Sequence, residues 1–285
     1  KINRIHLFDS RKDAFKENQV LQENMIISGF KQSSCQVSEG EVLISRSSND
    51  RFTDCEFLNV SEDILWGKDR EGFLFIPSTL SEASSIGLMS SLPCSLLDLG
   101  VSVSTGPVVA HRLRSHFRAE SGIPMVYCSS VKNGLAQSAV EHTKNKPYIH
   151  DNDSTRKWLV PERSYLLVRR FSSKEEASRI NCSVYQHGED QEWLGIDNKL
   201  NFFHFGDKPM PIDLIYGLYV YLSSSLVDQF YRIFSGHTQI NSGDLRAIRY
   251  PSLASLESVG RDFKVCFSTD QDLIDSAAQC FFREK

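Results

Sequence analysis

The fold is decided around one stretch, FSGHTQINSGDLR, at residues 234–246. The segment before it, residues 212–234, has apolar side chains at helical spacing and predicts a core helix. Asn241 and Asp244 have the spacing of a capping box, which predicts a second, short helix over residues 242–248. The stretch therefore joins the most apolar helix of the chain to a polar one.

The loop between these helices is rich in side chains that form hydrogen bonds. His237, Thr238, Gln239 and Asn241 carry donors and acceptors of the kind that read base edges or hold a sugar-phosphate backbone. The start of the following helix would also attract phosphate. These features favour a recognition loop, and the alternative is a helix–loop–helix connection without a ligand.

The composition is that of an ordinary globular protein. Of the 285 residues, 40% are hydrophobic and 24% are charged. The seven cysteines are odd in number and form no C-x-x-C pair, which disfavours a disulfide framework and a zinc ribbon. We therefore expect reduced thiols and a cytoplasmic location. The chain starts at Lys1 in a strand-like run without a signal peptide, so we expect it to be a fragment of a longer protein.

A net charge of -4 gives no global signal for nucleic-acid binding, so any such binding needs a local basic patch. Residues 111–118 contain three arginines and no acid, and include Arg112 and Arg114. Residues 156–179 contain seven basic residues against three Glu, and include Arg169, Arg170 and Lys174. Such a run is also typical of a solvated surface.

Predicted helices and strands are mixed along the chain without a βαβ rhythm. We predict strands at residues 5–8, 41–46, 55–60, 73–76, 99–109, 124–129, 165–171, 177–185 and 200–205. We predict helices at residues 20–30, 80–92, 212–234, 242–248, 253–259 and 272–282. This order favours an α+β fold with mixed or antiparallel sheets, packed helices and a helical C-terminal part. The uncharged run at residues 214–227 is too short to cross a membrane.

Common catalytic motifs are absent, including G-x-G-x-x-G, the P-loop, H-E-x-x-H and G-x-S-x-G. An acid-x-Lys pair, which some metal-dependent nucleases use, occurs at residues 197–199 and 262–264. A nuclease would need a divalent metal and Asp197 or Asp262 for cleavage. Because the chain has 36 acidic residues, such pairs also arise by chance. A protein-interaction domain without a role on DNA is the third possibility.

Several blocks, taken in order, resemble one family. They are IHLFDSRKDAF at residues 5–15, VLQEN at 20–24, VSTGPVV at 103–109, LVRRFSSKEE at 167–176, NKLNFFH at 198–204 and the loop at 234–246. Their order is similar to that in the adenine-specific DNA methyltransferases of the PstI/BsuBI and Eco57I-like restriction-modification type. The resemblance spans nearly the whole chain. Two departures are Lys199, where a histidine is expected, and Ala177-Ser178, where more arginine is usual.

The resemblance implies the C-terminal portion of such an enzyme. Residues 1–62 would be the end of the catalytic domain, and residues 63–285 a target-recognition domain. The chain has neither the Asn-Pro-Pro-Tyr-like segment that receives the flipped adenine nor a glycine-rich segment for S-adenosylmethionine. We therefore expect no catalytic, cofactor-binding or metal-binding residue here, and no methyl transfer by this chain alone. The expected partners are double-stranded DNA and a catalytic domain in cis, with S-adenosylmethionine used by the full-length enzyme.

The candidate DNA-binding residues come from four segments of the chain and fall into three groups by role. Basic residues would contact phosphates, Ser104 and Thr105 beside Gly106 would donate to a phosphate, and the loop would read bases. The full set is Ser104, Thr105, Arg112, Arg114, Arg169, Arg170, Lys174, His237, Thr238, Gln239, Asn241 and Arg246. The alternative for each arginine is an ordinary surface ion pair, and for His204 a place in the core.

Overall fold

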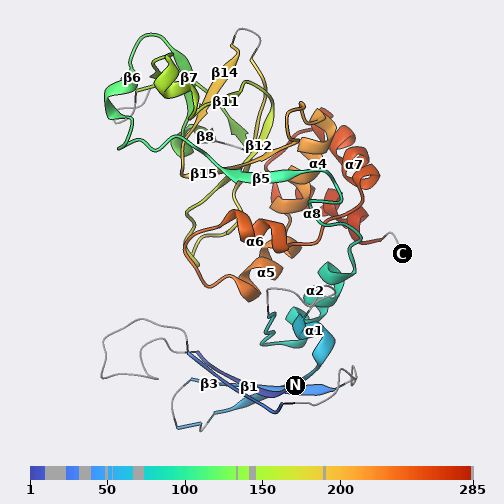
Figure 1. The fold of residues 1–285 in the computed structure, drawn as a ribbon. Coiled ribbons are helices and arrows are strands. Elements are labelled where there is room, and N and C mark those ends of the chain that lie inside the picture. The colour runs from blue at the N-terminus through green and yellow to red at the C-terminus, as the bar shows by residue number, and fades with distance from the viewer. Residues whose placement is uncertain are drawn as a thin grey trace. The chain divides into compact units, whose positions relative to one another are not determined.

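A computed structural model describes residues 1–9, 24–31, 40–48, 51–52, 54–66, 74–132, 134–140, 146–188 and 191–283. The chain divides into two compact units (Figure 1). The first consists of Lys1–Ser91 with Gln229–Gly236, and the second of Leu92–Asp228 with His237–Lys285. Both contain sheets and helices, so the predicted α+β class is confirmed. The boundary predicted between residues 62 and 63 divides a catalytic domain from a target-recognition domain. The division into compact units does not test it, so it stays a prediction.

The first unit is built on a four-stranded sheet in the order β2-β1-β3-β4. Its strands are β1 (Ile2–Phe8), β2 (Met25–Gly29), β3 (Glu41–Ser47) and β4 (Glu56–Ser61). β1 runs parallel to β3, and the other pairs are antiparallel, including the predicted pair β3 and β4. Ile5, Val42 and Ile44 of this sheet form a core with Leu65 of α1 (Glu62–Trp66) and Ala83 of α2 (Leu80–Ser91).

Two predictions in this unit are wrong. The described part of the predicted helix 20–30 contains strand β2, whose apolar residues pair with β1. Long-range pairing overrides the local helical pattern there, and residues 20–23 lie outside the described residues. The predicted strand 73–76 has no sheet partner over residues 74–76. Phe75 instead packs its ring against Phe230 and Phe234, at centroid distances of 5.1 and 5.5 Å.

The second unit contains two sheets. The six-stranded sheet has the order β5-β15-β12-β13-β9-β8. Its strands are β5 (Ser102–Thr105), β8 (Val131–Lys132), β9 (Leu135–Ala136), β12 (Tyr165–Arg169), β13 (Cys182–Tyr185) and β15 (Leu200–His204). The five-stranded sheet has the order β11-β14-β7-β10-β6. Its strands are β6 (Phe117–Arg118), β7 (Ile123–Val126), β10 (Tyr148–Ile149), β11 (Val160–Pro161) and β14 (Trp193–Ile196).

Helices cover one side of the six-stranded sheet, where α4 packs against β12 and β13 (Figure 1). The helices that follow the sheets are α4 (Ile212–Ser223), α5 (Ser225–Phe234), α6 (Ser242–Ala247), α7 (Leu253–Val265) and α8 (Gln271–Ala278). Shorter pieces are α3 (Asp153–Arg156), η2 (Arg114–His116), η3 (Cys128–Ser130) and η4 (Gln279–Phe282). α4 and α7 approach closely at Gly260, where a Cβ atom would lie 1.8 Å from the Asp213 carbonyl oxygen.

The predicted single helix 212–234 is wrong in one respect, because it breaks into α4 and α5. Ser224 is extended, with ψ at 146°. The Asp275 carboxylate accepts hydrogen bonds from the backbone N–H and the hydroxyl of Ser225, at 2.7 and 2.6 Å, and so caps α5. Elsewhere, strand 177–185 shortens to β13, and helix 253–259 extends to Val265. Among the described residues, no helix is long and apolar enough to cross a membrane.

Candidate nucleic-acid interface

The loop after α5 joins the six-stranded sheet at the end of β12. Phe171 and Gln239 form an antiparallel bridge. The Ser172 N–H donates to the Thr238 carbonyl oxygen at 3.0 Å, and the Ile240 N–H donates to the Arg170 carbonyl oxygen at 2.7 Å. Residues 238–240 therefore extend the sheet as a short strand would, and their backbone is fixed by bonds to a distant part of the chain.

This loop has one buried residue that anchors it and three exposed polar residues. Ile240 is fully buried, at 0% exposure, whereas His237, Thr238 and Gln239 are exposed. Residues directly opposite in an antiparallel pair project to the same face, so Gln239 stands beside Phe171. Phe171 is itself 43% exposed. Polar side chains and one aromatic ring thus face solvent from a fixed backbone.

Two buried side chains hold the backbone carbonyl groups of the loop. Asn201 of β15 is 0% exposed, and its side-chain amide donates to the Ile240 carbonyl oxygen at 2.8 Å. Its amide oxygen accepts from the Thr105 hydroxyl of β5 at 3.0 Å. Arg179 is 1% exposed, and its guanidinium donates to the His237 carbonyl oxygen. The buried Asp228 carboxylate accepts the Arg179 N–H at 2.6 Å.

The helix that follows begins as its sequence predicts. The Asn241 N–H donates to the Asp244 carboxylate at 2.9 Å, which is one half of the predicted capping box. α6 has only six residues, and this carboxylate already lies at its first turn, so we assign no phosphate site to the helix start. Arg246 is exposed, and its guanidinium donates to the Val103 carbonyl oxygen of β5 at 2.9 Å.

Ser104 and Thr105 lie on β5 next to the loop, but their hydroxyl groups already have partners within the sheet. The Ser104 hydroxyl is 2.9 Å from Nε2 of His204. Burial lowers the pKa of His204, which favours the neutral imidazole. The chain then turns at Gly106, where a Cβ atom would lie 2.2 Å from the Asp197 carbonyl oxygen, so only glycine fits.

The basic residues at the end of β12 and just after it have different partners. The Arg170 guanidinium donates to the Asn198 carbonyl oxygen at 2.7 Å and lies 5.8 Å from the centre of the Phe171 ring. Arg169 lies 3.7 Å from the Glu176 carboxylate, and its side chain is 37% exposed. Lys174 is half-buried in the following turn. Arg170 is therefore held by a backbone carbonyl group, and Arg169 lies partly exposed beside the Glu176 carboxylate.

Arg112 and Arg114 lie in a different part of the second unit. Both are exposed, on either side of Leu113. Leu113 and Phe117 are buried in a core with residues of β7 and β10, and this packing holds the backbone of η2. Among the described residues, no contact links these arginines to the loop. The structure thus brings Ser104, Thr105, Arg169, Arg170, Arg246 and the loop together, and it places Arg112 and Arg114 apart.

The residues of the nuclease alternative lie apart as well. Asp197 is 5% exposed, burial raises its pKa, and its backbone N–H donates to the Val126 carbonyl oxygen at 3.0 Å. Asp262 is on α7, where Lys264 forms an ion pair with Asp213 at 2.5 Å. Within the described ranges, no three His, Cys, Asp or Glu side chains gather where they could hold a metal. The six cysteines in these ranges are free thiols.

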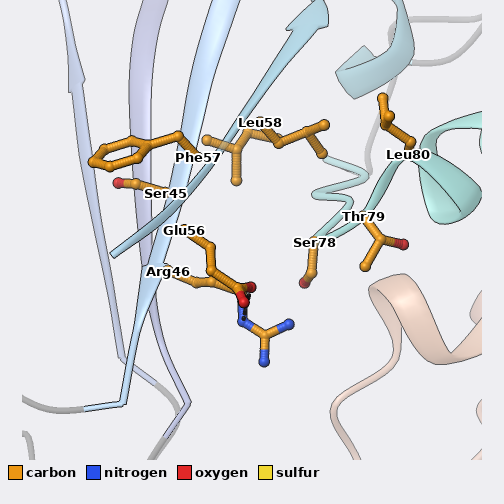
Figure 2. A pocket seen from close by; sticks show the side chains of 9 residues that line it. Ser45, Arg46, Glu56, Phe57, Leu58, Ser78, Thr79 and Leu80 are labelled. Carbon is orange, nitrogen blue, oxygen red and sulfur yellow. Dashed lines mark ion pairs between the residues drawn. The ribbon is translucent and has the colours of Figure 1, made fainter. Parts of the chain in front are cut away.

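Two cavities lie outside this interface. One, of about 270 Å³, lies in the first unit between β3, β4 and the start of α2 (Figure 2). Arg46 and Glu56 stand together on its sheet side, 3.8 Å apart, and Ser78 lies across from them (Figure 2). The other, of about 420 Å³, is lined by residues of β9 and β13, including Tyr185. Neither cavity is lined by a predicted site residue.

Arg179, Asn201 and Phe171 are parts of the interface that the sequence interpretation did not select. Asn201 has a local signal, because it is a lone amide between Leu200 and Phe202 in a buried strand. Arg179 has none, because its partner His237 is 58 residues away. Phe171 is the first residue after β12, and only its exposure marks it.

Known proteins resemble the chain closely in sequence. It is 36% identical over 262 residues to the Type II methyltransferase M.PstI of Providencia stuartii, which covers 90% of this chain and 51% of that protein. It is 37% identical over 268 residues to the Type II methyltransferase M.BsuBI of Bacillus subtilis, which covers 91% of this chain and 52% of that protein. No family model matches the chain.

The chain belongs to the family of Type II methyltransferases that includes M.PstI and M.BsuBI. It spans about half the length of these relatives. Among solved structures, it is similar to the type IIG restriction endonuclease BpuSI, with a TM-score of 0.40, 10% identity, and coverage of 99% of this chain and 43% of that one. A similarity this distant supports no argument about function.

Proposed function

We propose that the chain is the DNA-binding, target-recognition part of an adenine-specific DNA methyltransferase of a restriction-modification system. In this proposal it is the C-terminal portion, with residues 1–62 ending the catalytic domain and residues 63–285 forming the recognition domain. The observation that carries the proposal is the loop at residues 237–239, whose exposed polar side chains project from a backbone fixed to β12. The family of the relatives supports a role on DNA.

The residues divide into two roles. Gln239 can form two hydrogen bonds with an adenine edge, and His237 and Thr238 supply further donors and acceptors. Arg112, Arg114, Arg169 and Lys174 contact phosphates, which position the duplex without reading it. Ser104, Thr105, Asn241 and Arg246 frame the loop through their contacts with β5, β15 and α6.

Methyl transfer needs a pocket for the extruded base and a site for S-adenosylmethionine. The sequence has no Asn-Pro-Pro-Tyr-like segment, and the residues that line the two cavities form no glycine-rich loop. These residues do not fit the cofactor, so we derive no transfer step from them. In our proposal a catalytic domain in cis supplies both sites, and the greater length of the relatives leaves room for it.

The test is selection of duplexes from a random library by the purified chain, followed by affinity measurements over a range of salt. We expect one sequence to be enriched, and log affinity to fall with log salt by about 0.9 for each phosphate contacted. Absence of salt-dependent DNA binding would contradict the proposal and favour an interaction domain. Metal-dependent cleavage of the selected DNA, lost in Asp197→Asn or Asp262→Asn, would favour a nuclease.

A further inference from the structure

We propose that Arg179 is a positioning residue that sets DNA sequence discrimination without touching DNA, by fixing the start of the recognition loop. For its effect on discrimination, this proposal rests on the proposed function. The claim that Arg179 fixes the loop does not, and it can be tested without DNA.

The position of Arg179 supports an indirect role. At 1% exposure its side chain cannot reach a ligand on the surface. Its guanidinium donates to the carbonyl oxygen of His237, the first of the three exposed side chains His237, Thr238 and Gln239. The amide of Asn201 donates to the carbonyl oxygen of Ile240, directly after the last of them. The three reading side chains thus lie between two buried clamps.

The two clamps hold different ends of the loop. Asn201 holds the end of the loop next to the bridge between Phe171 and Gln239. Backbone hydrogen bonds to the strand already fix the chain at that end. At the His237 end, the Arg179 guanidinium contacts the loop from the core. A planar guanidinium holds an acceptor in a defined direction better than a flexible ammonium group does. Arg179 is therefore best placed to decide how ordered His237 and Thr238 are before binding.

How well the loop is ordered in the free protein affects the affinity for cognate DNA and for non-specific DNA differently. A loop that is loose in the free protein must be ordered when it meets base edges, and this ordering reduces affinity for the cognate sequence. Non-specific binding depends on phosphate contacts, which do not require the loop to be ordered. Loss of the Arg179 clamp should therefore lower discrimination and leave the salt dependence unchanged.

The experiment compares Arg179→Lys and Arg179→Met with a matched control, Arg249→Lys, in the full chain. Arg249 also donates to backbone carbonyl oxygens, those of Leu92 and Pro93, away from the loop. Hydrogen exchange of the loop amides is measured first, without DNA. We expect exchange at residues 237–240 to rise about tenfold in Arg179→Met, the effect of losing one good hydrogen bond, and less in Arg179→Lys.

Affinity is then measured for the selected duplex and a scrambled one. We expect the ratio of the two affinities to fall about tenfold in Arg179→Met, with non-specific affinity and salt slope kept, and to hold in Arg249→Lys. Unchanged loop exchange, or an equal rise in the control, overturns the clamp. If exchange of the loop amides rises but the ratio of cognate to scrambled affinity is unchanged, the proposed effect on discrimination is overturned. If Arg179→Met does not fold, Arg179→Lys decides by the same criteria.

A wild-type chain that shows no discrimination would refute the proposed function instead. The exchange measurement would still decide whether Arg179 fixes the loop. The two failures are therefore distinguishable.

Discussion

The loop at residues 237–239 and the segment at residues 112–114 belong to the same unit and both expose polar side chains, but they are held in different ways. The loop is bonded to β12 through backbone groups and is clamped from below by Arg179 and Asn201. At residues 112–114 the backbone bonds are local: the Arg112 N–H donates to the Val109 carbonyl oxygen at 3.0 Å, and the Leu113 carbonyl oxygen accepts from the His116 N–H at 2.9 Å. Long-range bonds fix the first, and local ones shape the second.

This difference separates two kinds of contact that composition alone does not distinguish. Reading a base edge requires donors and acceptors in fixed positions, because a misplaced hydrogen bond loses its energy. Neutralising a phosphate requires only a nearby charge on a flexible stem. The loop has the first property and Arg112 and Arg114 have the second, so the two regions should respond differently to substitution.

The largest expected effect is on stability, at Asn201. Asn201→Leu removes the donor to the Ile240 carbonyl oxygen, in a buried site, and the acceptor of the half-buried Thr105 hydroxyl. We expect the free energy of unfolding to fall by about 2–4 kcal/mol, since each buried group left unpaired costs about 1–3 kcal/mol. Chemical denaturation measures this. Arg112→Leu is the control and should change stability by less than about 0.5 kcal/mol, and an equal loss in both variants would remove the contrast between the regions.

Next in size is the effect of Gln239→Ala on specificity. Gln239 is exposed, and its backbone stays bridged to Phe171 whatever its side chain, so the loop should keep its shape. Under the proposed function we expect Gln239→Ala to lose about 1–3 kcal/mol of discrimination, with non-specific affinity nearly unchanged. Cognate and non-cognate affinities and the melting temperature are measured together. A lower melting temperature with an unchanged affinity ratio would show that Gln239 only braces the loop.

Much of this interface could be predicted from the sequence, because its signals are local. The spacing of Asn241 and Asp244 predicts the start of α6, and short runs rich in apolar residues predict β12 and β15. The Arg179 clamp could not be predicted, since a bond between residues 58 positions apart leaves no local pattern. Strand β2 was missed for the same reason, because it forms by pairing with β1.

A smaller effect is expected at the arginines. Arg114→Ala should weaken binding to all duplexes alike and lower the salt slope by about 0.9, the contribution of one phosphate. Arg170→Ala should differ, because it leaves the Asn198 carbonyl oxygen without its guanidinium donor and so lowers stability as well. Salt titrations of affinity and melting curves of both variants separate the two. A sequence-dependent loss in Arg114→Ala would place that residue among the base readers.

The smallest effect is expected at Phe171, which lies where the two kinds of contact meet. Its ring stands beside Gln239 on one side and 5.8 Å from the Arg170 guanidinium on the other. Because the ring is 43% exposed, Phe171→Leu should cost less than about 1 kcal/mol of stability, the size of an exposed cation–π contact. If the ring also contacts a base, this substitution should lower affinity for the cognate duplex more than for a scrambled one. Phe171→Tyr keeps the ring and should therefore keep the wild-type preference for the cognate duplex. If the leucine and tyrosine variants bind both duplexes alike, the role of Phe171 is limited to orienting Arg170.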